Sequence, residues 1–106
     1  MSGKTRKQQL QEMLAEMPED AFLHYGLGME YVGEGNDEEA ARCFRQICQQ
    51  TPDYVPAYQQ AGQTLLRLGR PTEAATILNQ GVAEARRQGN QHAAEEMQGL
   101  LDGIGE

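Results

Sequence analysis

The sequence predicts an all-α protein, and three observations support this prediction. Residues that favour helices dominate the 106-residue chain, whereas β-branched residues are sparse and tryptophan is absent. Apolar residues recur at the spacing of helix faces, in stretches of about 14 residues. Glycine and proline separate these stretches at Pro18, Gly33 to Gly35, Pro52, Gly69 to Pro71, and Gly89. We therefore expect six helices joined by short turns.

The first predicted helix occupies residues 4–17. Its start, Thr5-Arg6-Lys7-Gln8, has the pattern of a capping box, in which two side chains bond reciprocally to the first-turn backbone. An apolar stripe at positions i, i+3, i+4 and i+7 follows, made of Leu10, Met13, Leu14 and Met17. This single helix is interpreted as half of a helical pair.

Residues 20–52 are predicted to form a complete pair of helices. Gly28 falls in the middle of the first helix, where glycine costs about 1 kcal/mol relative to alanine. A neighbouring helix is therefore expected to approach closely there. Asn36 and the three acidic residues after it predict a capped start for the second helix, so the acidic run is interpreted as a cap and not as a catalytic site.

A second pair is predicted at residues 54–88, and a last helix at residues 90–102. Gly62 again lies in the middle of a helix, and Pro71 suits a first helical turn because its missing N–H has no intrahelical partner there. One side of the last helix is apolar, with Ala93, Ala94, Met97, Leu100 and Leu101. This pattern predicts a terminal capping helix.

The two pairs repeat each other with a period of 34 residues. Between residues 18–50 and 52–84 seven positions are identical, more than the roughly two that ordinary composition gives by chance. The matches are Pro18 with Pro52, Gly28 with Gly62, Gly35 with Gly69, Glu39-Ala40-Ala41 with Glu73-Ala74-Ala75, and Gln46 with Gln80. The period indicates a stack of repeated units.

These units resemble the tetratricopeptide repeat, a helix-turn-helix unit of the same length. The first reads His24-x-x-Leu27-Gly28-x-x-Tyr31, then Ala40-x-x-x-Phe44 and Pro52, with His24 where tryptophan is commonest. The second reads Tyr58-x-x-Ala61-Gly62-x-x-Leu65, then Ala74-x-x-x-Leu78, with Arg86 in place of the proline. The resemblance implies an α-solenoid: one domain over residues 1–106, with six antiparallel helices in a short right-handed superhelix.

The resemblance also implies a function, because the first helix of each repeat lines a concave groove that binds peptides or helices in this family. The groove residues that this register predicts are Phe22, Tyr25, Met29, Gln59, Gln60, Gln63 and Arg67. Half of this surface is apolar or aromatic and half is rich in amides, which suits a protein or peptide partner with an apolar anchor. A role of Phe22, Tyr25 and Met29 in packing is an equal alternative.

Composition excludes several other classes of partner. With 16 acidic against 9 basic residues the net charge is −7, which argues against a nucleic acid partner. No apolar stretch approaches the roughly 18 to 20 residues of a membrane span, so we expect no membrane association. Cys43 and Cys48 lie about 140° apart on one helix and are not expected to pair, which favours a reducing, cytoplasmic setting.

The sequence offers no catalytic constellation, and we predict neither an enzyme nor a bound cofactor or metal. His24, His92 and the two cysteines are not spaced as catalytic dyads or metal ligands. His24 is expected to pack between helices, and both cysteines are expected to be small buried hydrophobes.

Two other kinds of binding place different requirements on the sequence. The family's carboxylate clamp for chaperone tails requires converging cations, whereas this groove offers Tyr25, Met29 and a single Arg67. Self-association into a homo-oligomer is the open alternative. In that case an apolar edge would be exposed at Leu10 and Leu14, and another at Leu100, Leu101 and Ile104.

Overall fold

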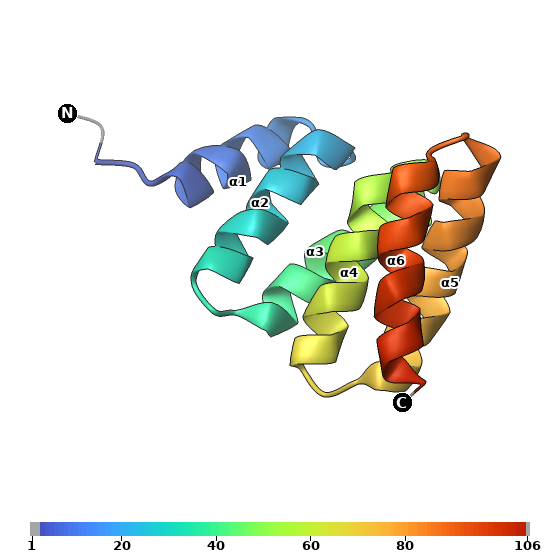
Figure 1. Ribbon diagram of the computed structural model, residues 1–106. Coiled ribbons are helices and arrows are strands. Elements are labelled where there is room, and N and C mark those ends of the chain that lie inside the picture. The colour runs from blue at the N-terminus through green and yellow to red at the C-terminus, as the bar shows by residue number, and fades with distance from the viewer. Residues whose placement is uncertain (1–2, 106) are drawn as a thin grey trace.

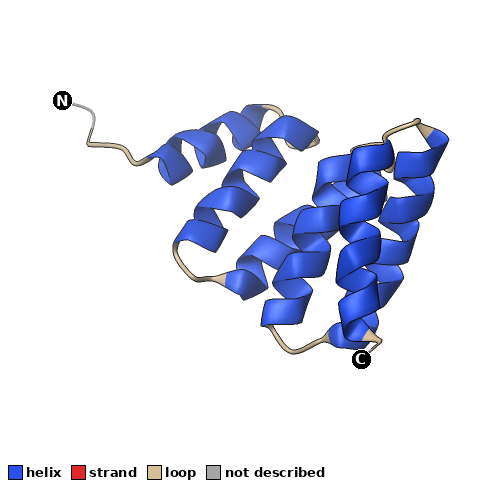
Figure 2. Cartoon of the chain, in the orientation of Figure 1, coloured by secondary structure: helices blue, strands red, loops and turns tan. Residues whose placement is uncertain are grey.

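The computed structural model describes residues 3–105, which form six α-helices and, within that range, no strand (Figures 1 and 2). The helices are α1 (Arg6–Glu16), α2 (Ala21–Gly33), α3 (Asp37–Gln50), α4 (Val55–Arg67), α5 (Pro71–Arg87) and α6 (Gln91–Ile104). Each packs against the next along the chain, and the stack is elongated, measuring 50 × 28 × 20 Å. The predicted all-α fold of six stacked helices is confirmed.

The turns between helices repeat one backbone motif. Gly35, Gly69 and Gly89 have φ angles of +76°, +73° and +75°, a region that glycine enters without steric cost. The backbone N–H of the residue after each glycine donates a hydrogen bond to the carbonyl oxygen five positions earlier, as Asn36 does to Tyr31 at 2.9 Å. These glycines therefore end α2, α4 and α5 and reverse the chain direction.

The predicted helix caps are present. Thr5 and Gln8 form the reciprocal capping box of α1, with N–O distances of 2.9 and 3.1 Å. The Asn36 side chain accepts a hydrogen bond from the Glu39 backbone at 3.3 Å, and three acidic residues occupy the first turn of α3. Pro71 begins α5, as expected.

Close approach of paired helices explains the two glycines inside helices. A Cβ at Gly28 of α2 would lie 2.6 Å from Phe44 Cε1 of α3, and one at Gly62 of α4 would lie 2.5 Å from Leu78 Cγ of α5. Phe44 and Leu78 are fully buried, as are Ala40 and Ala74 on the same helices. The two pairs thus share one packing arrangement, displaced by 34 residues.

A side chain in each pair also ties its first helix to the turn before it. His24 Nε2 lies 2.7 Å from the carbonyl oxygen of Pro18, and the Tyr58 hydroxyl donates to the carbonyl oxygen of Pro52 at the same distance. His24 is half-buried, in agreement with the predicted packing role. His24 and Tyr58, one period apart, thus hold the first helix of each pair to the proline before it.

Both cysteines are buried and unpaired, as expected. Desolvation by burial raises the pKa of Cys43 to about 11 and that of Cys48 to about 12, from an ordinary value of 9.0. The thiols are therefore protonated at neutral pH and serve as small apolar groups of α3.

The edges of the stack differ from the prediction at both ends. On α1 only Leu10 is buried and Leu14 is half-buried, so these two residues do not form an exposed edge. Met13 and Met17, expected in the packing stripe, are instead 48% and 49% exposed. At the other end Leu100, Leu101 and Ile104 are half-buried against the core. They pack against the preceding helices because α6 contacts both α4 and α5.

Alanine substitution tests the close approach of the paired helices. Gly62→Ala is expected to lower the free energy of unfolding by about 1 kcal/mol, since overpacking costs about 1–3 kcal/mol and the gain in helix propensity is about 1 kcal/mol. Gly99→Ala in α6 is the matched control, because no atom lies within 4 Å of its added Cβ. Urea unfolding should show the control to be neutral or stabilising. Equal shifts in the two variants would refute the packing argument.

Removing the Tyr58 hydroxyl tests the repeated tie to the preceding turn. Tyr58→Phe leaves the Pro52 carbonyl without its protein donor and should cost about 0.5–1.5 kcal/mol in thermal unfolding. Tyr31→Phe, in the first helix pair, is the control, because it also removes a tyrosine hydroxyl but leaves the contact with Pro52 in place. The tie has no energetic role if both variants melt at the wild-type temperature.

The buried cysteines predict a dependence of stability on pH. In the folded protein the pKa values of both thiols lie above 9. The contribution of the protonated thiols to the free energy of unfolding is therefore fully present below pH 9 and is lost as the pH rises toward about 12. Urea midpoints at a series of pH values should therefore fall less steeply in this range for the Cys43→Ala, Cys48→Ala double variant. In the wild type, thiol-reactive dye should label neither cysteine at pH 8 until the protein unfolds. Rapid labelling of the folded protein would contradict this account.

Candidate functional site

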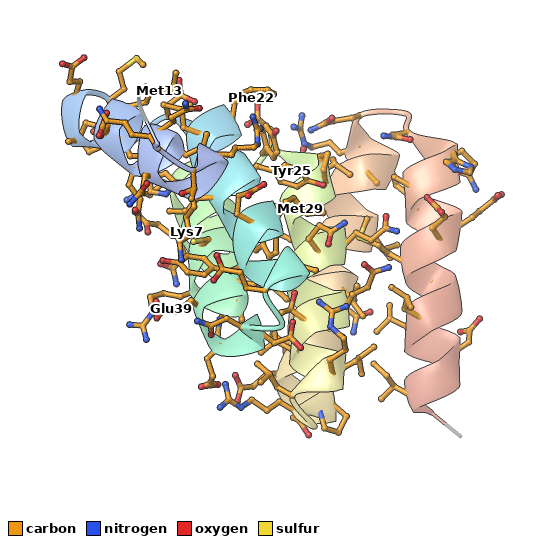
Figure 3. All side chains as sticks on the ribbon, turned by 90° about the vertical axis from the view of Figure 1, so that its left-hand side faces the viewer. Lys7, Met13, Phe22, Tyr25, Met29 and Glu39 are labelled. Atoms are coloured by element: carbon orange, nitrogen blue, oxygen red, sulfur yellow. The ribbon has the colours of Figure 1, made fainter. Side chains whose placement is uncertain are left out.

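The predicted site residues of α2 lie along one side of that helix, as Figure 3 shows for Phe22, Tyr25 and Met29. Phe22 is 71% exposed and Met29 is 37% exposed, whereas Leu23 and Leu27 of the same helix are both 8% exposed. The seven-residue separation of these two places them on the same helix face. They provide two apolar contact points on the surface that α2 presents to solvent.

Tyr25 lies between these two residues but has a structural role. Its ring centroid is 5.6 Å from that of Phe44 on α3 and 5.7 Å from that of Tyr54 at the start of α4, in tilted geometry. Burial raises the pKa of Tyr54, and the nearby Tyr25 adds to the shift. Tyr25 therefore joins the two repeats and exposes only part of its ring.

The three predicted glutamines of α4, Gln59, Gln60 and Gln63, are all half-buried. The Gln60 backbone carbonyl accepts a hydrogen bond from the buried Thr64 hydroxyl, which satisfies that hydroxyl inside the helix. We refer to Phe22, Tyr25, Met29, Gln59, Gln60, Gln63 and Arg67 as the α2–α4 surface. The two halves of this surface come from equivalent positions, because Tyr25 and Met29 precede Gln59 and Gln63 by one repeat.

Arg67, at the edge of this surface, is held by an acidic side chain. Its Nε lies 3.2 Å from both carboxylate oxygens of Asp37, and its Nη2 lies 3.1 Å from Oδ1. Arg70 pairs in the same way with Glu38, at 3.2 Å between Nη2 and Oε2. The acidic start of α3 therefore has a second role besides capping, since it joins α3 to the end of α4 and the start of α5.

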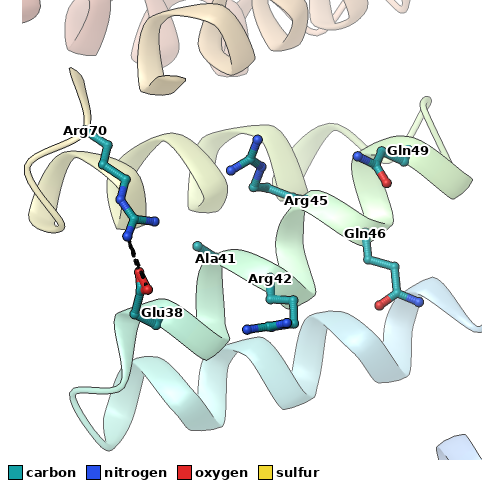
Figure 4. A pocket seen from close by; sticks show the side chains of 7 residues that line it. All are labelled: Glu38, Ala41, Arg42, Arg45, Gln46, Gln49 and Arg70. Carbon is teal, nitrogen blue, oxygen red and sulfur yellow. Dashed lines mark hydrogen bonds and ion pairs between the residues drawn. The ribbon is translucent and has the colours of Figure 1, made fainter. Parts of the chain in front are cut away.

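A hollow that sequence reasoning missed lies on another face, along α3, with Arg70 of the turn before α5 at one end (Figure 4). It has a volume of about 480 Å³ and is lined by Glu38, Ala41, Arg42, Arg45, Gln46, Gln49 and Arg70. Arg45 reaches Glu73 of α5 at 2.8 Å, and Arg42 pairs with Glu39 at 3.3 Å. The arginines are therefore neutralised by neighbouring carboxylates. Helical periodicity could not reveal the Arg45–Glu73 pair, because these two residues are 28 positions apart in the chain.

The described part of the chain, residues 3–105, contains no group of three or more His, Cys, Asp or Glu side chains that could hold a metal ion. In the same range, no helix combines the length and apolar character that crossing a membrane requires. His92, the second histidine of the sequence, is exposed on α6 and lies 3.2 Å from Glu96.

Comparison with known proteins places this arrangement in a family. A tetratricopeptide repeat profile matches residues 31–97. A TPR repeat-containing protein of Pseudomonas aeruginosa is 32% identical over 88 residues, which cover 83% of this chain and 84% of that protein.

Solved structures agree with this match. The solution structure of a tetratricopeptide repeat domain protein from Salinibacter ruber is 32% identical, with a TM-score of 0.76 over 82% of this chain and 88% of that one. A protein from Bordetella parapertussis is 25% identical, with a TM-score of 0.80 over 96% of this chain and 89% of that one. The chain therefore belongs to the tetratricopeptide repeat family.

Proposed function

We propose that this protein is a non-catalytic interaction module that binds a peptide or helix of another protein on the α2–α4 surface. Tetratricopeptide repeats generally mediate protein–protein interaction, and this general role applies to the chain as a member of the family. The observation that carries the finer proposal is the exposure of Phe22 and Met29 beside a row of half-buried glutamines.

The chemistry of this surface supports a partner with an apolar anchor. Met29 offers a flexible, polarizable contact, and Phe22 offers a large ring that loses little conformational entropy when it is covered. Gln59 and Gln63 can donate to and accept from an exposed backbone. The anchor would therefore lie on α2, and the polar side of the partner would lie on α4.

An acidic chaperone tail is a poor fit to the same surface. Two or three converging cations are needed to grip a carboxylate firmly, and Arg67 already forms three close contacts with Asp37. A carboxylate ligand would have to displace Asp37 from this pair. We therefore propose a neutral or apolar partner segment, bound without a cofactor. The two unpaired thiols are consistent with action in the cytoplasm.

Self-association is the second candidate, and Met13 and Met17 favour it because they leave an apolar strip uncovered on α1. At the other end of the described stack, Leu100 and Ile104 are half-buried and line a hollow of about 330 Å³ with Leu66 and Pro71. The corresponding side of α6 carries His92, Glu95 and Glu96, all exposed. Burying these carboxylates without cations would oppose head-to-tail stacking of two copies.

Capture experiments with paired variants test binding on the α2–α4 surface. The Met29→Gln, Gln63→Ala double variant is expected to reduce capture of partner proteins from the source cell's lysate by about tenfold or more, because it removes the apolar contact and one amide. Gln80→Ala on α5 is a matched control at an exposed glutamine of another face. Quantitative mass spectrometry of the bound proteins provides the readout. If both variants retain wild-type partners in wild-type amounts, the α2–α4 surface is not the binding site.

A further inference from the structure

The four large apolar side chains that are most exposed in residues 3–105 all lie between the start of α1 and the end of α2: Met13, Met17, Phe22 and Met29. Met13 belongs to α1 and Met17 directly follows that helix, so both lie outside the α2–α4 surface. In the first complete repeat the position that corresponds to Met13 is covered, because Ile47, one period later, is only 1% exposed.

The third member of this series shows which helices cover the position. Gly81, two periods after Met13, lies on α5, and a Cβ there would be 2.5 Å from Tyr58 Cβ and from Met97 Sδ. Tyr58 belongs to α4, the partner of α5 in its own pair, and Met97 belongs to α6, the helix that follows. Two helices therefore enclose this position, one from each side.

Met13 has only one of these two neighbours. The helix that follows α1 is α2, which packs on Leu10 so closely that a Cβ at Gly26 would lie 3.4 Å from Leu10 Cδ2. Within residues 3–105, no helix takes the place beside α1 that α2 takes beside α3 and α4 takes beside α5. The exposure of Met13 and Met17 thus marks a vacant helix-packing position.

The ion pairs of α1 show on which side this position lies. Arg6, which shares a helix face with Met13, pairs with Glu30 of α2 at 3.4 Å and lies near Gly26. On the other flank of α1, Lys7 pairs with Glu34 at 3.0 Å and lies over the Tyr31 ring. The side of α1 that carries Met13 therefore adjoins the side of α2 that carries Gly26 and Phe22.

Met13, Met17 and Phe22 are exposed apolar side chains of α1, the α1–α2 turn and the start of α2, and we call these three residues the α1 edge. Met13 and Phe22 both lie at the top of the α1–α2 pair in Figure 3. A shallow hollow of about 330 Å³ beside Met13 is also lined by Gln9, Glu12 and Glu16. Of these carboxylates Glu12 pairs with Lys4 at 2.8 Å, and the exposed Glu16 and Glu19 follow toward the end of α1.

We infer that the α1 edge binds an amphipathic, positively charged α-helix of a partner protein. This helix packs antiparallel to α1, in the place that α4 occupies beside α5. Its apolar side chains cover Met13, Met17 and Phe22, and its lysines or arginines face Glu16 and Glu19. The methionines can adapt to different apolar side chains, and the net charge of −7 attracts a cationic segment.

The charges argue against a second copy as the occupant. The first-in-pair helix that another copy could offer is α6, whose corresponding side presents His92, Glu95 and Glu96. Two of these side chains are acidic, and docking would place them against an edge that is itself bordered by Glu12 and Glu16. Repulsion and desolvation would both oppose this contact.

A defined peptide tests the inference without knowledge of the natural partner. The probe is a capped helical peptide of about four turns, with leucine on one face and lysine elsewhere. Two control peptides replace either the lysines by glutamate or the leucines by glutamine. Titration at about 0.15 M salt, where long-range attraction is screened, should show binding of the first peptide only.

Methyl NMR of labelled methionines locates the site within the same titration. The signals of Met13 and Met17 should shift, whereas Met97, which is fully buried, serves as the internal reference. The Met13→Gln, Met17→Gln double variant should weaken binding tenfold or more. Glu16→Lys should weaken binding of the lysine peptide and strengthen binding of the glutamate peptide. All these positions are exposed, so the variants should keep the wild-type circular dichroism.

Gln59→Ala, Gln63→Ala is the control variant, and it separates this inference from the proposed function of the α2–α4 surface. Loss of binding in this variant alone would place the peptide on the α2–α4 surface and overturn the α1 edge. Equal binding to all variants would reveal unspecific attraction to the acidic protein and would also overturn it. A third outcome would also overturn the inference: light scattering detects a dimer of the wild type, and this dimer dissociates in the Met13→Gln, Met17→Gln variant. The occupant of the α1 edge would then be a second copy.

Discussion

The contact on which the structure depends is the close approach of the two helices of each pair, made possible by Gly28 and Gly62. Phe44 and Leu78 fill the space that a side chain at these glycines would occupy, and both are fully buried. Because each helix pair is held at this short distance, the next pair can pack in the same orientation. The turn glycines Gly35 and Gly69, and the ties from His24 and Tyr58, then repeat with the same period of 34 residues.

A stack built from one repeated contact has surfaces of two kinds. Its sides carry charges that are paired across helices, such as Arg67 with Asp37 and Arg45 with Glu73, so few cations remain for an anionic ligand. Within residues 3–105 the first helix packs on α2 alone and the last packs on α4 and α5, and these two ends of the stack differ. The α6 end is half-buried and acidic, whereas the α1 end leaves methionines uncovered. This asymmetry distinguishes the α1 edge from an ordinary polar cap.

Much of the fold could be predicted from the sequence because its determinants are local or periodic. Capping residues, turn glycines and the glycines inside helices each require a particular backbone geometry, and the structure has that geometry at Thr5, Gly35 and Gly28. The site was less predictable. The i, i+3, i+4, i+7 spacing placed Met13 and Leu10 in one apolar stripe. This spacing does not show which side of the helix another helix covers. The contacts of Tyr25 with Phe44 and Tyr54, and of Arg67 with Asp37, join residues far apart in the chain.

Hydrogen exchange of the free protein tests most directly whether the paired-helix contact governs the stack. Only Leu10 is buried on α1, which within residues 3–105 packs on α2 alone, whereas α4 and α5 bury many residues between their neighbours. Amides of α4 and α5 should therefore exchange only with a free energy close to that of global unfolding, and amides of α1 should exchange with a much smaller one. Equal protection of α1 and α4 would contradict the account, because a helix without its paired contact would then be as stable as one that has it.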